Sequence, residues 1–120
     1  MATKIYIDQG HNPEAPNAGA EGNGLREQDI TYRVGQELAA LLRADPNFEV
    51  RLSRPTPEST LGTSNSTSLR ARVDDANRWG ADAFISIHTN AAENRNAQGA
   101  ETFILGTDRM EDNLDVAMRE

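Results

Sequence analysis

The chain has 120 residues, and 19 acidic against 12 basic side chains give it a formal net charge of −7. The length predicts a single domain with its own core, and the negative charge argues against nucleic acid and anionic membranes as partners. The chain has no cysteine, which excludes disulfides and cysteine-ligated zinc. Its apolar runs are too short for a transmembrane helix.

The first element is a strand that ends in a histidine. Residues 5–11 read Ile-Tyr-Ile-Asp-Gln-Gly-His, an apolar alternation that stops at an acid and turns through a glycine. This pattern predicts a buried strand followed by a loop that carries chemistry. Residues 12–24 are rich in Asn, Pro, Gly and Ala, so they predict a long functional loop without regular structure.

A helix is expected next, led in by residues 25–29 and ended by Asp45-Pro46-Asn47. Its apolar residues recur at helical spacing and predict one face packed on the sheet. These residues are Ile30, Val34, Leu38, Leu41 and Leu42. A short alternating strand is expected over residues 48–52.

The second half begins with a polar loop over residues 53–68, followed by a helix from about Ser68 to Trp79 that Gly80 ends. The spacing places Leu69, Val73 and Ala76 inward. It places the charged residues of this helix in solvent: Arg70, Arg72, Asp74 and Asp75.

The remaining elements complete an α/β pattern. Residues 83–87 are almost wholly apolar and predict a central strand buried on both faces. Residues 101–105 predict a fourth strand, and residues 110–120 the start of another helix. This order predicts one α/β domain whose mainly parallel or mixed sheet is flanked by helices on both faces.

Both histidines of the chain, His11 and His88, follow predicted strands. Carboxyl ends of parallel strands carry the active site in open α/β sheets, so we interpret the two histidines as ligands of one metal. A third ligand must then be a carboxylate, and the candidates are Asp8, Glu14, Glu21 and Glu27. Glu27 is preferred because it begins a helix, where the helix dipole favours an anion, and Glu21 is the second choice. The alternative is that each histidine is an ordinary hydrogen-bonded loop residue and Glu27 a capping acid.

Five blocks of the sequence together resemble the type 3 family of zinc-dependent N-acetylmuramoyl-L-alanine amidases. The blocks are Ile7-Asp8-Gln9-Gly10-His11, Gly24-Leu25-Arg26-Glu27-Gln28-Asp29, Ser68-Leu69-Arg70-Ala71-Arg72 with Ala76-Asn77, Ser86-Ile87-His88-Thr89-Asn90-Ala91 and Gly99-Ala100-Glu101-Thr102. They occur in the family's order from the first strand to the end of the chain.

The resemblance implies a hydrolase that cuts the amide bond between N-acetylmuramic acid and L-alanine in peptidoglycan, with Zn²⁺ as cofactor and the cell wall as its extracellular location. It implies an autolysin-type bacterial enzyme with an amidase/zinc-exopeptidase-like fold. Carried over by position, His11, Glu27 and His88 are the zinc ligands, and Asn90 and Glu101 lie beside the site as supporting or substrate-contacting residues. The simpler interpretations are a turn residue for Asn90 and a solvated acid for Glu101. Arg72 and Asn77 are expected to brace the helix against the sheet.

The chain departs from the family's pattern in two places. It has Asp8-Gln9-Gly10-His11-Asn12 where the family often has Asp-Pro-Gly-His-Gly, and nothing matches the Val-Glu-x-Gly-Phe motif that holds the catalytic glutamate. We therefore expect residues 1–120 to be an amidase catalytic domain that is incomplete at its C-terminus. Its catalytic acid is unknown, with Glu101 and Glu14 the first candidates. An open sheet edge would then favour self-association.

Three alternative functions are kept. One is a zinc- and wall-binding module with little turnover, which the missing acid favours. Another is a zinc carboxypeptidase-like hydrolase, although its close histidine–glutamate motif is not present. The last is an acidic α/β domain without a metal.

Overall fold

The computed structural model describes residues 1–90 and 96–104. The chain divides into two units, residues 1–89 and residues 90–120. All regular elements described lie in the first unit. They are β1 (Thr3–Gln9), β2 (Glu21–Gly22), β3 (Leu25–Arg26), α1 (Glu27–Arg43), β4 (Phe48–Leu52), α2 (Asn65–Trp79) and β5 (Ala83–Ile87).

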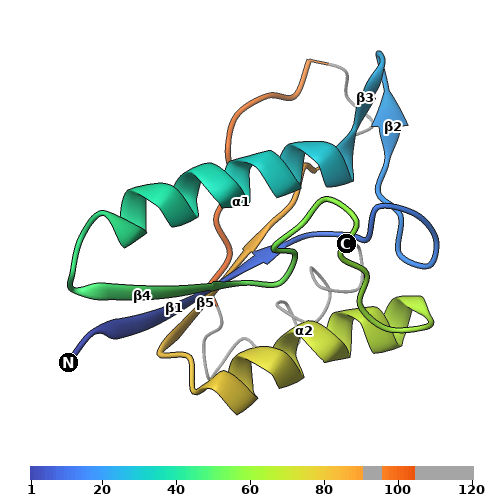
Figure 1. The fold of residues 1–120 in the computed structure, drawn as a ribbon. Coiled ribbons are helices and arrows are strands. Elements are labelled where there is room, and N and C mark those ends of the chain that lie inside the picture. Colours follow the sequence, from blue (N-terminus) through green and yellow to red (C-terminus); the bar gives the residue numbers. More distant parts are fainter. Residues whose placement is uncertain (91–95, 105–120) are drawn as a thin grey trace. The chain divides into compact units, whose positions relative to one another are not determined.

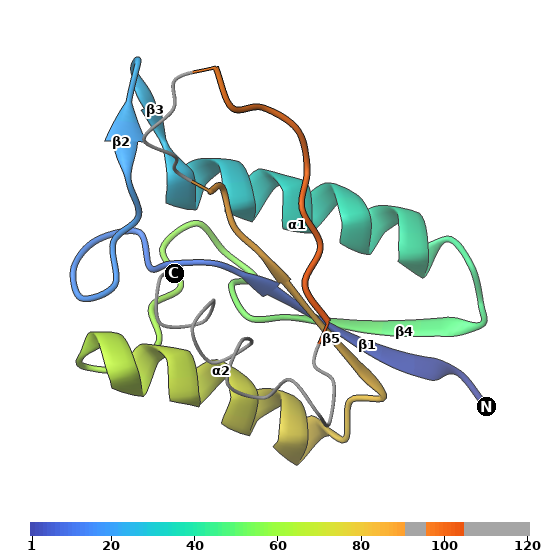
Figure 2. The ribbon, with the colours of Figure 1, turned by 180° about the vertical axis from the view of Figure 1, so that it is seen from behind.

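The main sheet has the order β4-β1-β5, and both pairings are parallel. Strand β1 lies in the centre, with Ile7 opposite Leu52 of β4 on one side and Ile85 of β5 on the other. Figures 1 and 2 show α1 on one face of this sheet and α2 on the opposite face. The predicted α/β fold with a parallel sheet between helices is confirmed.

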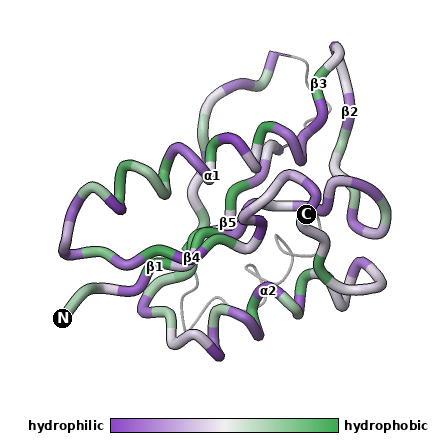
Figure 3. Tube along the Cα trace, in the orientation of Figure 1, coloured by the Kyte–Doolittle hydropathy of each residue, from purple (hydrophilic) through white to green (hydrophobic). Residues whose placement is uncertain are grey.

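The apolar core lies between α1 and the sheet. Its buried members are Ile5, Ile7, Ala39 and Leu52, with Leu38, Leu42, Phe48, Val50 and Ile87 packed against them. In Figure 3 the hydrophobic residues gather along the middle of the sheet and on α1. Residues Ile5–Gln9 of β1 are all buried and β4 alternates in burial, and both predicted strands are confirmed.

The predicted inward face of α1 is partly wrong. Val34 is 43 % exposed and Leu41 74 % exposed, whereas Thr31, Gly35 and Ala39 are buried. The reason is steric: a Cβ at Gly35 would lie 2.9 Å from Cδ of the buried Gln9 side chain, so the helix approaches the sheet on its small residues. The face of α1 that packs on the sheet therefore carries smaller side chains than hydropathy alone indicates.

Helix α2 begins three residues earlier than predicted because Ser64 caps it. The Ser64 side chain accepts from the Thr67 backbone N–H, and the Thr67 side chain accepts from the Ser64 N–H, a reciprocal capping box. Gly80 ends the helix in the left-handed conformation (φ 81°), as predicted. Val73 is 48 % exposed, so its predicted inward position is wrong. Arg72, placed in solvent by the helical pattern, is 1 % exposed because it binds the end of β1.

The loop predicted for residues 12–24 contains a short hairpin. Strands β2 and β3 pair antiparallel, with Glu21 opposite Arg26. Asn23 and Gly24 connect them with φ values of 53° and 76°. This Asn-Gly pair is the usual sequence of a type I′ hairpin turn, a signal that the composition of the loop concealed.

In the C-terminal half, the strand predicted over residues 83–87 is confirmed as β5, but its predicted central position with both faces buried is wrong, and the described part of the strand predicted over residues 101–105 is not a strand. β5 is an edge strand within the part of the chain that the structure describes, and Phe84 and Ile85 are 42 % and 39 % exposed. Residues 101–104 form no regular element, since no backbone ladder with a described strand holds them, and Leu105 lies outside the described residues. The helix predicted over residues 110–120 also lies outside them. Self-association through an open edge stays a prediction.

Among the residues that the structure describes, none belongs to a helix with the length and apolar character needed to span a bilayer.

Candidate metal centre

His11 lies at the carboxyl end of β1 in a backbone conformation that is unusual for histidine. Its φ is 69°, in the left-handed region, which costs a residue with a side chain about 1–2 kcal/mol. Its Nδ1 lies 3.0 Å from Oδ1 of Asn17, and both side chains are buried. The surroundings therefore fix both the backbone and the ring of His11.

Glu27 is the first residue of α1, and its carboxylate is buried between two backbone donors. The N–H of Thr89 donates to Oε1 at 2.9 Å and the N–H of Ala20 donates to Oε2 at 3.2 Å. Burial alone would raise the pKa of Glu27. The two backbone donors and the neighbouring imidazoles of His11 and His88 outweigh burial, so that its pKa is lowered. The side chain is thus held as a carboxylate.

His88 follows β5 and reaches the same edge because β1 and β5 are parallel, with Gln9 opposite Ile87. Its ring stands nearly perpendicular to that of His11, at 86° with 4.9 Å between centroids. Gly10 makes this approach feasible, because a Cβ there would lie 2.6 Å from both Nδ1 of His88 and the carbonyl oxygen of Ile87. The close contact requires glycine at position 10.

Three ligand atoms from His11, Glu27 and His88 form a small triangle. Nε2 of His11 lies 3.1 Å from Oε1 of Glu27 and 3.3 Å from Nδ1 of His88, and the third side measures 3.6 Å. Ligands about 2.0–2.1 Å from a tetrahedral zinc ion lie about 3.3–3.4 Å apart. The donor types and their separations therefore fit zinc, and this is the group of His, Asp and Glu residues that can hold a metal ion within the described ranges.

The histidines offer opposite ring nitrogens to this triangle: Nε2 from His11 and Nδ1 from His88. A histidine that binds a metal through one nitrogen usually donates a hydrogen bond from the other. For His11 that second contact is the one with Asn17.

Two buried arginines, each 1 % exposed, hold the loop that carries His11. Arg72 of α2 forms an ion pair with Asp8 at 2.8 Å and donates to the carbonyls of Gln9 and His11 at 2.6 and 2.8 Å. Asp8 also accepts from Ser86 Oγ at 2.8 Å. Arg72 thus braces α2 against the end of β1, as the resemblance implied.

Arg54 holds the neighbouring backbone from the other side. Its Nη1 donates to the carbonyl of Gln28 at 2.8 Å, and its backbone N–H donates to Oε1 of Gln9 at 2.8 Å. Burial lowers the pKa of Arg54, and the positive charge of Arg72 lowers it further. Neither arginine reaches the ligand triangle itself, so both act on the backbone beside it.

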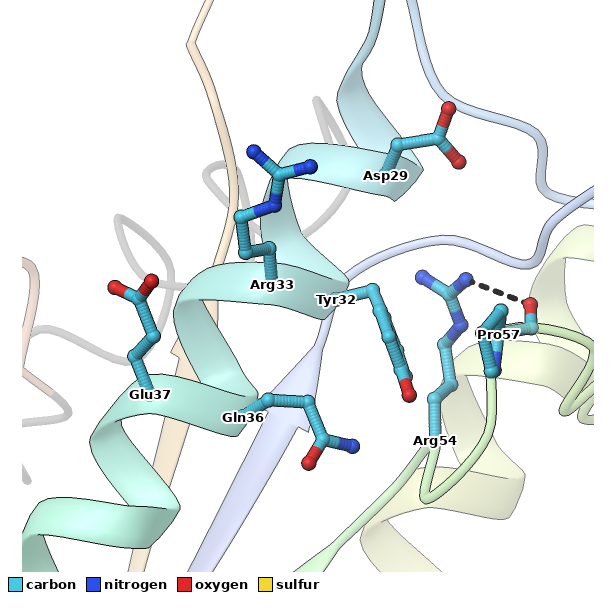
Figure 4. A pocket seen from close by; sticks show the side chains of 7 residues that line it. All are labelled: Asp29, Tyr32, Arg33, Gln36, Glu37, Arg54 and Pro57. Atoms are coloured by element: carbon cyan, nitrogen blue, oxygen red, sulfur yellow. Dashed lines mark hydrogen bonds between the residues drawn. The ribbon is translucent and has the colours of Figure 1, made fainter.

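A pocket of about 280 Å³ lies on α1 and the loop after β4, apart from the triangle (Figure 4). It is lined by Asp29, Tyr32, Arg33, Gln36, Glu37, Arg54 and Pro57. The Arg54 guanidinium lies over the Tyr32 ring, 5.6 Å from its centroid. None of the three ligand residues lines this pocket.

The other residues singled out in the sequence lie elsewhere. Asp8 is occupied by Arg72, while Glu14 and Glu21 are exposed and pair with Arg26 at 3.0 and 3.2 Å. Arg26 also donates to the carbonyl of Pro13. Among the carboxylates considered from the sequence, the structure brings only Glu27 to the two histidines.

Asn90 and Glu101 belong to the second unit. Nδ2 of Asn90 donates to Oε2 of Glu101 at 3.0 Å, and Glu101 is exposed. Their roles beside the metal stay predictions.

The sequence interpretation missed Asn17 and Arg54. Asn17 stands in an irregular loop, where no periodicity marks it, although asparagine is among the few residues that tolerate its φ of 63°. Arg54 lies two residues after the end of β4 in a polar stretch, which gave no indication that it is buried.

The sequence of the chain is similar to that of known proteins. The N-acetylmuramoyl-L-alanine amidase family matches residues 5–119. The chain is 40 % identical over 89 residues to the N-acetylmuramoyl-L-alanine amidase CwlM of Bacillus licheniformis, covering 73 % of this chain and 32 % of that protein. It is 36 % identical over 102 residues to the sporulation-specific N-acetylmuramoyl-L-alanine amidase of Bacillus subtilis, covering 84 % and 35 %.

The fold is similar to solved structures as well. The N-acetylmuramoyl-L-alanine amidase of Clostridium difficile superposes with a TM-score of 0.65 at 30 % identity, covering 81 % of this chain and 48 % of that one. The chain therefore spans about a third of the length of these curated relatives and about half of this solved chain.

Proposed function

This chain belongs to the N-acetylmuramoyl-L-alanine amidase family, and from that premise we propose that it hydrolyses the amide bond between N-acetylmuramic acid and L-alanine in peptidoglycan. The proposal includes a zinc ion held by His11, Glu27 and His88, and action outside the cytoplasm at the cell wall. It is supported above all by the ligand triangle, whose sides of 3.1, 3.3 and 3.6 Å suit tetrahedral zinc. The family match favours this reaction over that of a carboxypeptidase-like hydrolase.

In this proposal the chain's own residues hold the zinc ion and orient the ligand atoms around it. Three protein ligands leave a fourth position for water or substrate, as in other catalytic zinc sites. When bound, zinc polarises the scissile carbonyl and lowers the pKa of its water to about 7. Glu27 stays anionic because Thr89 and Ala20 donate to it, and it contributes the one negative charge among the three ligands.

Glu101 and Glu14 are the candidates for the acid–base group. Glu27 is a ligand in this proposal, and Glu14 is engaged with Arg26. We propose Glu101 as the residue to examine first. Glu101→Gln should slow amide hydrolysis by about 10²- to 10⁴-fold without changing zinc content, since a positioned acid–base group contributes that much.

The test of the function combines zinc content with product analysis. The zinc-loaded chain should release peptides with new L-alanine amino termini from purified peptidoglycan, detected by N-terminal labelling and mass spectrometry. Glu27→Gln should lose zinc and release together. The matched control is Glu21→Gln, because Glu21 is exposed and outside the triangle, and this variant should keep both.

Two results would contradict the proposal. Stoichiometric zinc with no new L-alanine termini would favour the alternative of a zinc- and wall-binding module with little turnover. If the chain bound no zinc, that result would contradict the proposed metal centre itself.

A further inference from the structure

Asn17 connects the candidate ligand His11 to helix α2. Its Oδ1 lies 3.0 Å from Nδ1 of His11, and its Nδ2 donates to Oγ of Ser68 at 3.1 Å. Its backbone N–H donates to Oδ1 of Asn65 at 2.7 Å. Ser68 is fully buried and Asn17 is 9 % exposed, so the contacts of the Asn17 amide with His11 and Ser68 are shielded from solvent.

A neutral imidazole carries its proton on one ring nitrogen only, and the two choices have different consequences for His11. With the proton on Nδ1, the ring donates to Asn17 and Nε2 keeps a lone pair for a metal. With the proton on Nε2, the ring would instead donate to Oε1 of Glu27, which lies 3.1 Å away. In the second form Nε2 carries the proton that it donates to Glu27, so it has no lone pair with which to bind a metal.

The orientation of the Asn17 amide decides between these forms. Because its NH₂ group is directed to Ser68, its oxygen faces His11, and an oxygen can only accept. The Nε2–H form would gain the Glu27 carboxylate as an acceptor but put the lone pair of Nδ1 against the Asn17 oxygen, so Asn17 shifts the balance toward the Nδ1–H form. The backbone N–H of Asn17 donates to Oδ1 of Asn65, which fixes this residue against the first turn of α2.

We propose that Asn17 is a positioning residue that keeps His11 in the Nδ1–H form, so that the lone pair of Nε2 faces Glu27 and His88. The role of this lone pair as a zinc ligand rests on the proposed function. The preference for the Nδ1–H form is a property of the metal-free chain. His88 presents its other nitrogen, Nδ1, so the two histidines should differ in the ring nitrogen that they offer to the metal.

The chain is well suited to the test because it has only two histidines. Long-range ¹H–¹⁵N correlation spectra of the metal-free chain, at a pH of about 8.5 where imidazole is neutral, report the tautomer of each ring. We expect the Nδ1–H pattern for His11. Asn17→Gly removes the amide but tolerates the positive φ of 63°, and it should move His11 to the Nε2–H form or to a mixture.

Two further variants separate this role from a structural one. Asn17→Asp keeps an acceptor oxygen and should restore the Nδ1–H pattern. Asn23→Gly changes the other left-handed asparagine of this region, in the β2–β3 turn (φ 53°), and should leave both rings as they are. Zinc affinity, measured against a competing chelator, should fall about 10- to 100-fold in Asn17→Gly and stay within twofold in Asn23→Gly.

The results separate the two proposals. An Nε2–H pattern for His11 in the native chain, or a pattern that does not change in Asn17→Gly, would overturn the role of Asn17. Zinc affinity that is equal in Asn17→Gly and the native chain would overturn it too. A native chain that shows the expected tautomer but has no zinc affinity would instead overturn the metal centre.

Discussion

Helix α1 covers one face of the sheet over apolar side chains, whereas α2 contacts the other face through charged and hydroxyl groups. On the α1 side, Ile5 and Ile7 pack with Leu52 and Ala39. On the α2 side, Arg72 pairs with Asp8. In Figure 3 the apolar residues follow α1 and the strands more than they follow α2.

The two faces stabilise the fold by different means, and only one of them also fixes the position of particular atoms. Burial of apolar surface on the α1 face stabilises the fold without fixing any particular atom, because the hydrophobic effect is non-directional. Hydrogen bonds on the α2 face have preferred distances and angles. They fix the end of β1, next to His11 of the candidate metal centre, relative to α2.

The largest expected effect is the loss of the Arg72 guanidinium. Arg72→Met should lower the free energy of unfolding by about 3–5 kcal/mol, because it leaves Asp8 buried without its counter-charge. Denaturant unfolding of the metal-free chain measures this. Arg70→Met is the control, because Arg70 is exposed on the same helix, and it should change stability by less than about 0.5 kcal/mol.

A second variant isolates the charge. Adding Asp8→Asn to Arg72→Met should recover part of the loss, because no unpaired buried carboxylate remains. An Arg72→Met chain as stable as the native one would show that the α2 face does not hold the end of β1.

A cavity on the α1 face should cost somewhat less. Ile7 is fully buried, and Ile7→Ala should lower the free energy of unfolding by about 2–5 kcal/mol. Leu41→Ala, at an exposed apolar position of α1, should change it by less than about 0.5 kcal/mol. In folded protein, Ile7→Ala should leave zinc affinity close to native, whereas Arg72→Met should weaken it. Equal loss of affinity in both variants would remove the distinction between the faces.

The smallest expected effect concerns how the free energy of unfolding depends on pH through Asp75 of α2. The hydrogen bond from Arg51 lowers the pKa of Asp75; partial burial opposes this shift and the hydrogen bond from Tyr6 adds to it. A folded pKa below the unfolded value of about 3.9 means that Asp75 stabilises the fold above that pH. This contribution is lost as pH falls through the folded pKa.

Asp75→Asn should therefore flatten the fall of stability between about pH 5 and pH 2. The change should be below about 1 kcal/mol, because the pair is partly exposed to solvent. Glu27 also has a lowered pKa, so the comparison must be the difference between native and variant curves. Parallel curves would exclude a contribution from Asp75.

The sequence was sufficient for the elements whose pattern is periodic. Strands β1 and β4, the parallel sheet and the two helices follow from alternation and helical spacing. It was insufficient where a single contact decides orientation. Gly35 turns toward the sheet because Gln9 fills the space beside it, and hydropathy does not encode that contact.

The site was predictable in the same uneven way. His11 and His88 are recognisable because each follows a strand, and Glu27 because it begins a helix. The exposed side of β5 could not be foreseen, since an apolar run does not reveal which strand occupies the centre of a sheet. Asn17 could not be found either, because its contact with the ring of His11 depends on a backbone angle and joins residues six positions apart.

The bare backbone at Gly10 has a consequence for how this protein tolerates change. Even one methyl group there would collide with the imidazole of His88 and the carbonyl of Ile87. In a saturation library, position 10 should thus reject every other amino acid as strictly as a coordinating position does, although it offers nothing for an ion to bind.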